Sequence, residues 1–159
     1  MIKIATLWNS CRSGYLFKPL QLYGFNWIKP HTMARCVNNI KELNIHKEAS
    51  FEYKLSVEIR GEYNIHGVVD CLDKKKNTMY EFKTVIEIQD VYYLQLAVYA
   101  FMYEMVNQKK TKYILFNILK NSYAEVRFKK GALREVIDIL LHAKYNTDDK
   151  THMEIFIRD

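Results

Sequence analysis

The middle of the chain shows two different spacings of apolar and polar positions. Apolar side chains alternate with polar ones from Phe51 to Ile59, so that every second residue falls on one face of a predicted strand. In residues 33–43 and 133–141 the apolar positions recur every three or four residues. That spacing is typical of amphipathic helices. The chain therefore combines helices and strands that each bury one face.

Polar turns divide the rest of the sequence into further elements. Strands are predicted over residues 64–72, 79–86, 113–119 and 123–128. A first helix is expected to follow Pro30, with Thr32 able to cap it, and a long helix to run from Asp90, as its cap, to about Asn107. The order is α-β-β-β-α-β-β-α. It predicts a single α/β (α+β) domain over residues 1–159, with a central mixed sheet of about five strands flanked by helices.

Composition excludes several classes of protein. Of 159 residues, 49% are hydrophobic and 26% charged, which excludes a disordered chain. The longest uncharged apolar stretch, from Val91 to Tyr103, is too short for a bilayer, which needs about 20 residues. Because the N-terminus also lacks a signal-peptide layout, we expect a soluble intracellular protein with no membrane partner. The net charge of +6 fits a polyanionic partner without identifying one.

The cysteines carry little chemistry. Cys11, Cys36 and Cys71 stand far apart and form no Cys-x-x-Cys pair. A cysteine zinc site is therefore not expected, and we interpret them as small buried hydrophobic residues.

The second and third predicted strands bring two acids together. If residues 74–77 form the loop of a hairpin, Asp70 lies directly across from Glu81, with Cβ atoms about 4.5–5.5 Å apart. Lys83 lies two residues beyond Glu81 and therefore on the same face, which Val68 and His66 would share.

Two opposed carboxylates destabilise a sheet unless something neutralises them. Mg²⁺ or Mn²⁺ can do so with one or two protein carboxylates, water and substrate phosphate. A lysine beside the metal can orient a water or neutralise transition-state charge, which predicts metal-assisted phosphodiester hydrolysis. The alternative is an exposed strand face with a Glu–Lys pair, but the apolar residues around both acids favour a buried site.

Three short motifs occur in order: Gly67-Val68-Val69-Asp70, Glu81-Phe82-Lys83-Thr84, and Gln95-Leu96-Ala97-Val98-Tyr99. With an early histidine and a glutamate before the sheet, this set resembles the PD-(D/E)XK nuclease superfamily. It most resembles the branch of RecB nuclease domains, CRISPR-associated RecB-like exonucleases and mitochondrial genome-maintenance exonucleases. The resemblance covers residues 31–99 and implies a restriction-endonuclease-like core.

The resemblance also implies roles for residues. Asp70, Glu81 and the main-chain carbonyl of Phe82 would hold one or two Mg²⁺ or Mn²⁺ ions, and Lys83 would be the catalytic lysine. Gln95 and Tyr99 are one helical turn apart, so both reach the same side of their helix. They would bracket the active site and touch the lysine or the DNA backbone.

Two further metal ligands are less determined by the sequence. His31 stands where the family pattern places its early histidine, and we favour it over His46 and His66. Glu52 resembles the glutamate before the sheet. Glu58 is the alternative, since alternation places both glutamates on the same face.

The chain also departs from the family pattern. No cysteine follows Cys71, so the iron–sulfur cluster of some relatives is not expected. Val69-Asp70 stands where the superfamily name has Pro-Asp. Helicase motifs are lacking, which leaves a stand-alone nuclease or a subunit with a helicase or recombination partner.

The predicted function is that of an exonuclease or end-processing enzyme on single-stranded or linear DNA, in DNA repair or recombination. The alternatives are a structure-selective endonuclease on DNA or RNA, a catalytically inactive nucleic-acid-binding subunit, and a protein-interaction module with accidental motifs. Lys29, Arg35 and residues 74–76 are candidates for backbone contacts, although a solvated turn is the favoured interpretation of residues 74–76. Richness in Lys, Asn, Ile and Tyr suggests an AT-rich genome, such as that of a virus or phage.

Overall fold

The computed structural model describes residues 29–145. The chain divides into two units, residues 1–38 and 39–159, which we describe separately. The first described helix, α3 (Pro30–Glu42), runs across this division. The helix begins at Pro30. Proline lacks a backbone N–H, but the N–H of the first helical residue has no partner within a helix, so no hydrogen bond is lost. The N–H of Thr32 donates to the carbonyl of Lys29, so Thr32 lies inside the first turn. The prediction that Thr32 caps the helix is therefore wrong.

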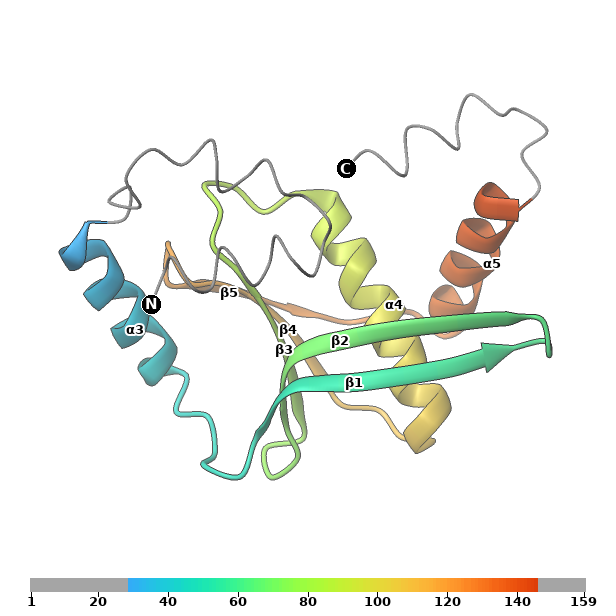
Figure 1. Cartoon of the computed structure of the whole chain (residues 1–159), viewed down its shortest axis with the longest axis horizontal. Helices are drawn as coiled ribbons and strands as arrows, with labels where there is room; N and C mark the ends of the chain where they lie inside the picture. Colours follow the sequence, from blue (N-terminus) through green and yellow to red (C-terminus); the bar gives the residue numbers. More distant parts are fainter. Residues whose placement is uncertain (1–28, 146–159) are drawn as a thin grey trace, which may run out of the picture. The chain divides into compact units, whose positions relative to one another are not determined.

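The second unit contains a five-stranded mixed sheet and two further helices (Figure 1). The strands are β1 (Ser50–Ile59), β2 (Tyr63–Asp73), β3 (Thr78–Lys83), β4 (Lys112–Asn117) and β5 (Ser122–Val126). The helices are α4 (Asp90–Asn107) and α5 (Ala132–Tyr145). The strands lie side by side in chain order. All neighbours are antiparallel except β3 and β4, which are parallel and joined through α4. The predicted fold class and element order are confirmed.

Turn residues set the ends of the hairpins. The β1–β2 turn takes left-handed backbone at Arg60 and Gly61, and the β2–β3 turn takes it at Asn77, the last residue of the predicted loop. The hairpin of β1 and β2 is long and passes in front of α4 in Figure 1. Its alternation stops at Glu52, which has a φ of 51°. Phe51 is consequently 60% exposed and does not join the buried face predicted for it.

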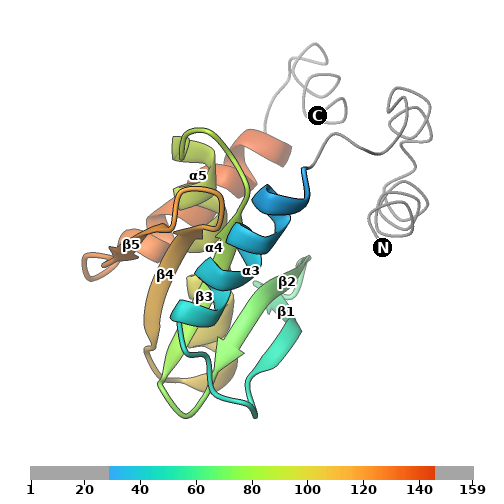
Figure 2. The ribbon, with the colours of Figure 1, turned by 90° about the vertical axis from the view of Figure 1, so that its left-hand side faces the viewer.

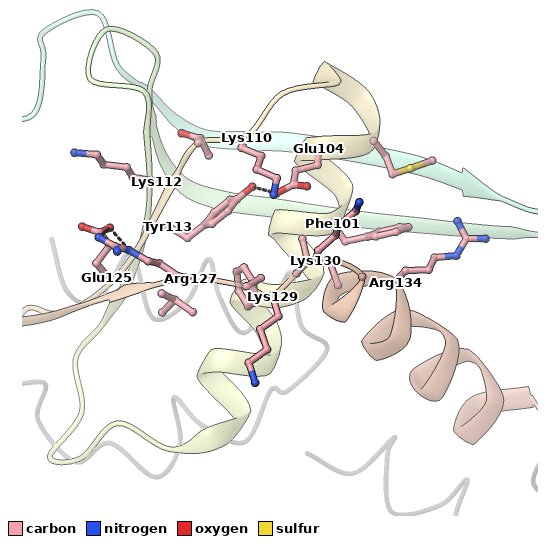
Figure 3. Close-up of a pocket in the computed structure, with 16 residues that line it drawn as sticks. Phe101, Glu104, Lys110, Lys112, Tyr113, Glu125, Arg127, Lys129, Lys130 and Arg134 are labelled. Atoms are coloured by element: carbon pink, nitrogen blue, oxygen red, sulfur yellow. Dashed lines mark hydrogen bonds and ion pairs between the residues drawn. The ribbon is translucent and has the colours of Figure 1, made fainter.

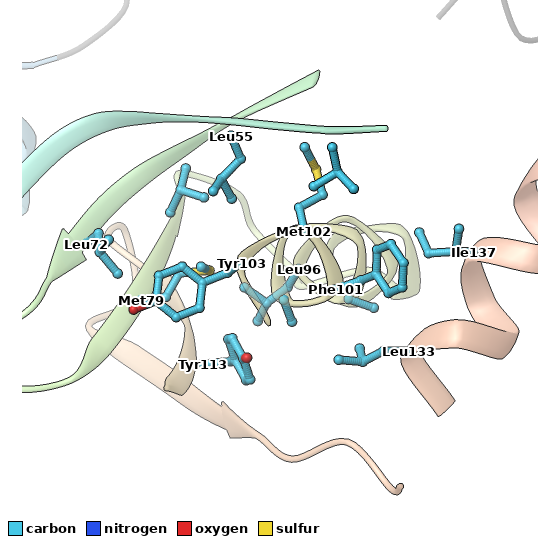
Figure 4. Close-up of a cluster of buried hydrophobic side chains, with 14 of the residues drawn as sticks. Leu55, Leu72, Met79, Leu96, Phe101, Met102, Tyr103, Tyr113, Leu133 and Ile137 are labelled. Carbon is cyan, nitrogen blue, oxygen red and sulfur yellow. The ribbon is translucent and has the colours of Figure 1, made fainter. Parts of the chain in front are cut away.

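Helix α4 is apolar on almost every side and forms the centre of the core (Figure 4). It packs against β1, β2, β4 and α5. Figure 4 shows Leu55, Tyr113 and Ile137 reaching it from three directions. In Figure 2, α4 and α5 lie behind β4 and β5. The helix has the predicted bounds, but Gln89 occupies the cap position without a side-chain cap, so Asp90 begins the helix instead of capping it.

The connection from β3 to α4 is longer than predicted. β3 ends at Lys83, so the expected strand to residue 86 is wrong at its end. Beyond Lys83, the N–H of Ile118 donates to the carbonyl of Lys83 at 2.8 Å, and Asn117 donates to the carbonyl of Val85 at 2.8 Å. Residues 84–89 therefore turn from the sheet toward α4 while β4 holds their start. Within residues 29–145, no helix is long and apolar enough to cross a membrane.

Candidate active site

The β2–β3 hairpin has the predicted register as far as its ladder extends. Three pairs are formed, the last of them between Cys71 and Tyr80. Asp70 and Glu81 occupy the next position, where the two strands separate. There the N–H of Phe82 donates to Asp70 Oδ2 at 2.7 Å. The side chain of Asp70 thus crosses to the main chain of β3 where ladder pairing ends.

The alternation of side chains along β2, which is one continuous strand, shifts near Asp70. Gly67 faces α4, because a Cβ at this residue would meet the ring of Tyr99. Val69 belongs to the core beside α4, and so does Leu72, although strict alternation would place these two on opposite faces. The alternation therefore shifts between them, where Asp70 lies across from the left-handed Glu52. Strand geometry before the shift turns His66 and Val68 away from α4, which corrects the prediction that they share the face of Asp70.

His66 is engaged on that other side. Its Nδ1 lies 3.0 Å from the hydroxyl of Ser56, and the residue is exposed. His46 is also engaged elsewhere: its Nδ1 accepts the N–H of Glu48 at 3.2 Å. Both contacts involve only Nδ1, so they do not decide among the three histidines, and the choice of His31 stays a prediction.

Lys83 links β3 to α4. Its Nζ donates to Glu81 Oε1 at 2.8 Å and to Gln95 Oε1 at 2.7 Å. Gln95 Nε2 then donates to the hydroxyl of Tyr99 at 3.1 Å. Lys83 also lies 5.0 Å from the centre of the Tyr92 ring, a cation–π distance. The second and third motifs of the sequence are therefore joined by one chain of hydrogen bonds.

Gly67 joins the first motif to the third. A Cβ at this position would stand 2.8 Å from Tyr99 Cε1 and 3.3 Å from Met102 Sδ. The first distance is shorter than a carbon–carbon contact allows. Glycine therefore leaves the space that the Tyr99 ring fills beside Gln95. Close packing of β2 on α4 explains the glycine three residues before Asp70.

Both acids of the hairpin are held in an environment that disfavours their charge. Burial raises the pKa of Asp70, against the N–H of Phe82 and the charge of Lys83. Burial likewise raises the pKa of Glu81, and the charge of Asp70 adds to it, while Lys83 opposes the shift. Tyr99 has a raised pKa for the same first reason, burial, with the negative charges of both acids adding to it. With both acids ionised, the two carboxylates and the one ammonium of Lys83 thus leave one negative charge in excess at a largely buried place.

The donor set fits a hard divalent cation. Glu81 Oε2 is buried and has no hydrogen-bond partner, and Asp70 Oδ1 receives no hydrogen bond from residues 29–145. A Mg²⁺ or Mn²⁺ ion would bind these two open carboxylate oxygens and favour the ionised form of both acids. No group of three His, Cys, Asp or Glu side chains in residues 29–145 forms a metal cluster by itself. The remaining ligands would be the Phe82 carbonyl and oxygens of water or phosphate.

The remaining predicted residues have different surroundings. Glu52 lies on β1 between Phe51 and Tyr53, whose partners Cys71 and Val69 flank Asp70, and its charge raises the pKa of Asp70. Glu58 pairs with Asn64 near the far turn, so the structure favours Glu52 of the two. His31 is exposed in α3, within the first unit, and its role as a ligand stays a prediction.

The remaining residues considered for nucleic-acid contacts are basic and lie outside the three motifs of the active site. Lys29 and Arg35 are exposed in the first unit, and their contacts stay predictions. The lysines of residues 74–76 contact the protein itself. Lys76 donates to the carbonyl of Asn44 at 2.5 Å, and Lys75 lies 3.8 Å from a carboxylate oxygen of Glu48. The interpretation of residues 74–76 as a solvated turn stays a prediction.

Two residues of the site were missed by sequence reasoning. Tyr92 places its ring beside Lys83, and Asn117 is almost fully buried where β4 ends. Asn117 is the register partner of Lys83, and its side chain also accepts the N–H of Leu119 at 3.1 Å. Helical spacing offered a signal for Tyr92, which lies three residues before Gln95. The role of Asn117 depends on the β3–β4 register, which no local pattern reveals.

Comparison with known proteins gives little beyond this geometry. No protein-family model and no curated protein matches the chain. The crystal structure of SSO0001 has a TM-score of 0.44 and 17% identity, over 87% of this chain and 70% of that one. A candidate exonuclease from Eubacterium rectale has a TM-score of 0.45 and 12% identity, over 84% of this chain and 62% of that one. The present chain thus spans less than two thirds of the latter, and at these scores neither likeness decides family or activity.

Proposed function

We propose that this chain is a metal-dependent nuclease of the PD-(D/E)XK superfamily that hydrolyses phosphodiester bonds. Its substrate would be single-stranded or linear DNA, which it would process as an exonuclease or end-processing enzyme. One observation carries the proposal. Lys83 joins Glu81 to Gln95 beside Asp70, and Glu81 Oε2 is buried without a hydrogen-bond partner among residues 29–145. A buried carboxylate oxygen without a partner calls for an explanation, and a bound cation supplies one.

The cofactor would be one or two Mg²⁺ or Mn²⁺ ions. Asp70, Glu81 and the carbonyl of Phe82 would hold the first ion, with His31 and Glu52 as further ligands. When bound, such an ion polarises the phosphate and activates water. The raised pKa values of Asp70 and Glu81 support this assignment, because a nearby cation favours the ionised form of both acids.

The residues of the chain would act on the phosphate and the attacking water. A lysine ammonium has three N–H donors, and Lys83 uses two of them on Glu81 and Gln95. The third has no acceptor in residues 29–145 and is free to donate to the water or to a phosphate oxygen. Charge that develops on the phosphoryl oxygens during in-line attack is stabilised by a donor held in advance.

Gln95 and Tyr99 would position this lysine and the DNA backbone. Gln95 accepts from Lys83 and donates to Tyr99, so its amide orientation is set from both sides. The hydroxyl hydrogen of Tyr99 then remains available for a phosphate oxygen. Lys29 and Arg35 would add backbone contacts that depend on salt and not on base sequence.

A cleavage assay tests this function. The purified protein is incubated with end-labelled single-stranded, linear duplex and circular DNA, in Mg²⁺, Mn²⁺ or EDTA. Asp70→Ala and Lys83→Ala remove two members of the site. Lys54→Ala removes an exposed lysine of β1 and is the matched control. We expect metal-dependent loss of linear DNA by the wild type and by Lys54→Ala, and strongly reduced loss by the two site variants.

The pattern of products separates the alternatives. Cleavage of linear but not circular DNA identifies an exonuclease, and nicking of circular DNA an endonuclease. DNA binding without cleavage by the wild type would identify an inactive binding subunit. Cleavage that survives Asp70→Ala would remove the proposed site. The absence of any divalent-ion binding would leave an interaction module.

A further inference from the structure

A second basic feature lies away from the candidate active site. A cavity of about 820 Å³ opens between the C-terminal part of α4, the start of β4, the end of β5 and the start of α5 (Figure 3). None of its lining residues belongs to the motifs of the active site. Its volume lies within the range of about 300–1,000 Å³ that is usual for ligand sites.

The rim of this cavity is strongly cationic. Six lining residues are basic: Lys110, Lys112, Arg127, Lys129, Lys130 and Arg134. Two are acidic, Glu104 and Glu125, so the lining has a net charge of six minus two, or +4. The whole chain has a net charge of +6. One cavity therefore gathers an excess of positive charge that is large beside that of the whole protein.

Much of this charge is not neutralised within the described chain. The carboxylate of Glu104 accepts the hydroxyl of Tyr113 at 2.8 Å, and Glu125 pairs with Arg127 at 2.9 Å. Arg134 lies 3.8 Å from a carboxylate oxygen of Asp138, so both arginines of the rim have acidic partners. The four lysines of the rim form no ion pair with residues 29–145. Like charges gathered at one opening repel each other, and an anionic ligand relieves that repulsion. The rim is thus suited to bind negative charge.

The floor of the cavity is aromatic. Phe101 and Tyr113 lie between the cations in Figure 3, but both belong to the core and are only 5% and 4% exposed. Phe128 is half-buried and packs edge-on against Tyr113 at 5.5 Å, so it is the more accessible ring of the floor. Thr111 also lines the cavity, and its buried hydroxyl has no hydrogen-bond partner among residues 29–145. A ligand with a flat apolar part and a negative charge would match the ring of Phe128 and the lysine rim.

We propose that this basic cavity is a second binding site for a nucleotide unit, with the base at the aromatic floor and the phosphate at the lysine rim. Nucleic acids combine both parts, and aromatic side chains flanked by cations are the common means of binding unpaired bases. An acidic peptide would use the rim and leave the floor empty. That the phosphate belongs to a nucleic-acid strand rests on the proposed function.

The position of the cavity separates it from the candidate active site. Glu104 follows Gln95 by nine residues on α4, or about two and a half turns. The two residues therefore lie on opposite sides of the helix and about 13 Å apart along it. The strand would therefore be held at a place distinct from where it is cut. A nuclease that holds its strand at a second place keeps it bound between cuts, and we expect this site to increase the length of strand degraded per encounter.

Paired charge reversals test this site by binding, apart from cleavage. The variant Lys129→Glu/Lys130→Glu changes the rim, and Lys47→Glu/Lys54→Glu makes the same change of charge at exposed positions outside it. Binding of a fluorescent oligothymidylate is measured by anisotropy in EDTA, over a range of salt concentrations. The same strand without bases, and free thymidine monophosphate, are the other two probes. Thermal unfolding shows whether each variant is folded.

We expect the rim variant to bind oligothymidylate at least about tenfold more weakly than the matched control. Its salt slope should fall by about 0.7 for each phosphate that the altered rim no longer binds. The strand without bases should bind the wild type about fivefold more weakly, because the aromatic floor then has no base to stack on. Competition by thymidine monophosphate at the cavity would identify a free nucleotide as the ligand, and its absence a strand.

Three results would overturn the proposal. Equal binding by the rim variant and the control would show that the cavity takes no nucleic acid. Equal binding of strands with and without bases would reduce it to a general polyanion surface. Loss of affinity for a polyglutamate peptide, without loss for DNA, would assign it to an acidic partner. Each outcome is independent of cleavage, so the nuclease proposal can fail while this one stands, and the reverse.

Discussion

The β2–β3 hairpin places acids in two contrasting settings only a few residues apart. At its turn, Asp73 is fully buried and accepts the N–H of His46 at 2.8 Å and that of Lys76 at 3.0 Å. Burial alone would raise the pKa of Asp73, but these hydrogen bonds hold it below its ordinary value. Both carboxylate oxygens of Asp73 thus accept hydrogen bonds, and the ionised form of Asp73 stabilises the fold.

Where the strands separate, the opposite balance holds. Asp70 and Glu81 have raised pKa values because burial outweighs their partners, and Glu81 Oε2 is left open. Sequence position alone does not distinguish these acids from Asp73, since all three lie in strands of one hairpin. The contrast teaches that the number of filled oxygens separates an acid that holds a turn from one that can receive a ligand.

The largest effect should come from breaking the active-site end of the hairpin. Lys83→Ala should lower the rate of DNA cleavage by about 10²–10³-fold, because it removes a donor held in advance for the phosphate. The measurement is single-turnover cleavage of linear DNA in Mg²⁺. Lys54→Ala should cleave as the wild type does. A Lys83→Ala variant with full activity would mean that the ion pair with Glu81 is structural.

The next effect concerns stability at the turn end. Asp73→Ala leaves two partly buried N–H groups without acceptors and should lower the free energy of unfolding by about 2–4 kcal/mol. Asp70→Ala removes one hydrogen bond but also an unfavourable buried charge, so its loss should be smaller. Urea unfolding of both variants without metal makes the comparison. A larger loss in Asp70→Ala would reverse the roles assigned to the two acids.

Periodicity was enough to predict the fold and the hairpin register. The turn at residues 74–77 brought Cys71 opposite Tyr80, because a two-residue repeat and a polar loop leave few other pairings. The sequence also predicted helix α4 with its correct ends, because an apolar run of that length, ended by polar residues, favours a helix over a strand.

What failed depended on backbone that no local pattern encodes. Strict alternation placed His66 with Asp70, but the left-handed Glu52 shifts the alternation between Val69 and Leu72. Positive φ at a glutamate is uncommon, so the sequence carried no warning of it. Asn117 was missed for a related reason, since its contact with Val85 joins residues that are 32 positions apart.

A smaller effect should follow from closing the gap between β2 and α4. Gly67→Ala places a methyl group 2.8 Å from Tyr99 Cε1, so the ring or the helix must shift. We expect the free energy of unfolding to fall by about 1–3 kcal/mol and cleavage to fall with it, because Tyr99 positions Gln95. The double variant Gly67→Ala/Tyr99→Leu should regain stability but not cleavage. Recovery of both would show that Tyr99 only packs.

The smallest effect gives the sharpest comparison, because it has opposite signs at the two settings. The pKa of Asp70 is raised in the folded protein, so Asp70 binds its proton more tightly there than in the unfolded chain. Its ionisation therefore destabilises the fold at neutral pH. This destabilisation decreases as the pH falls toward 3.8, the ordinary pKa of the carboxyl group. Asp73 has a lowered pKa, so its ionised form stabilises the fold above 3.8, and this stability is lost as the pH falls through the folded pKa. Without metal at neutral pH, Asp70→Asn should therefore raise and Asp73→Asn lower the free energy of unfolding, each by up to about 1 kcal/mol, with both differences shrinking in acid. Urea unfolding as a function of pH measures both, and equal signs at neutral pH would contradict the distinction between the two acids.

Adding Mg²⁺ should then stabilise the wild type and Asp73→Asn but not Asp70→Asn, since only the last lacks the carboxylate proposed to hold the ion.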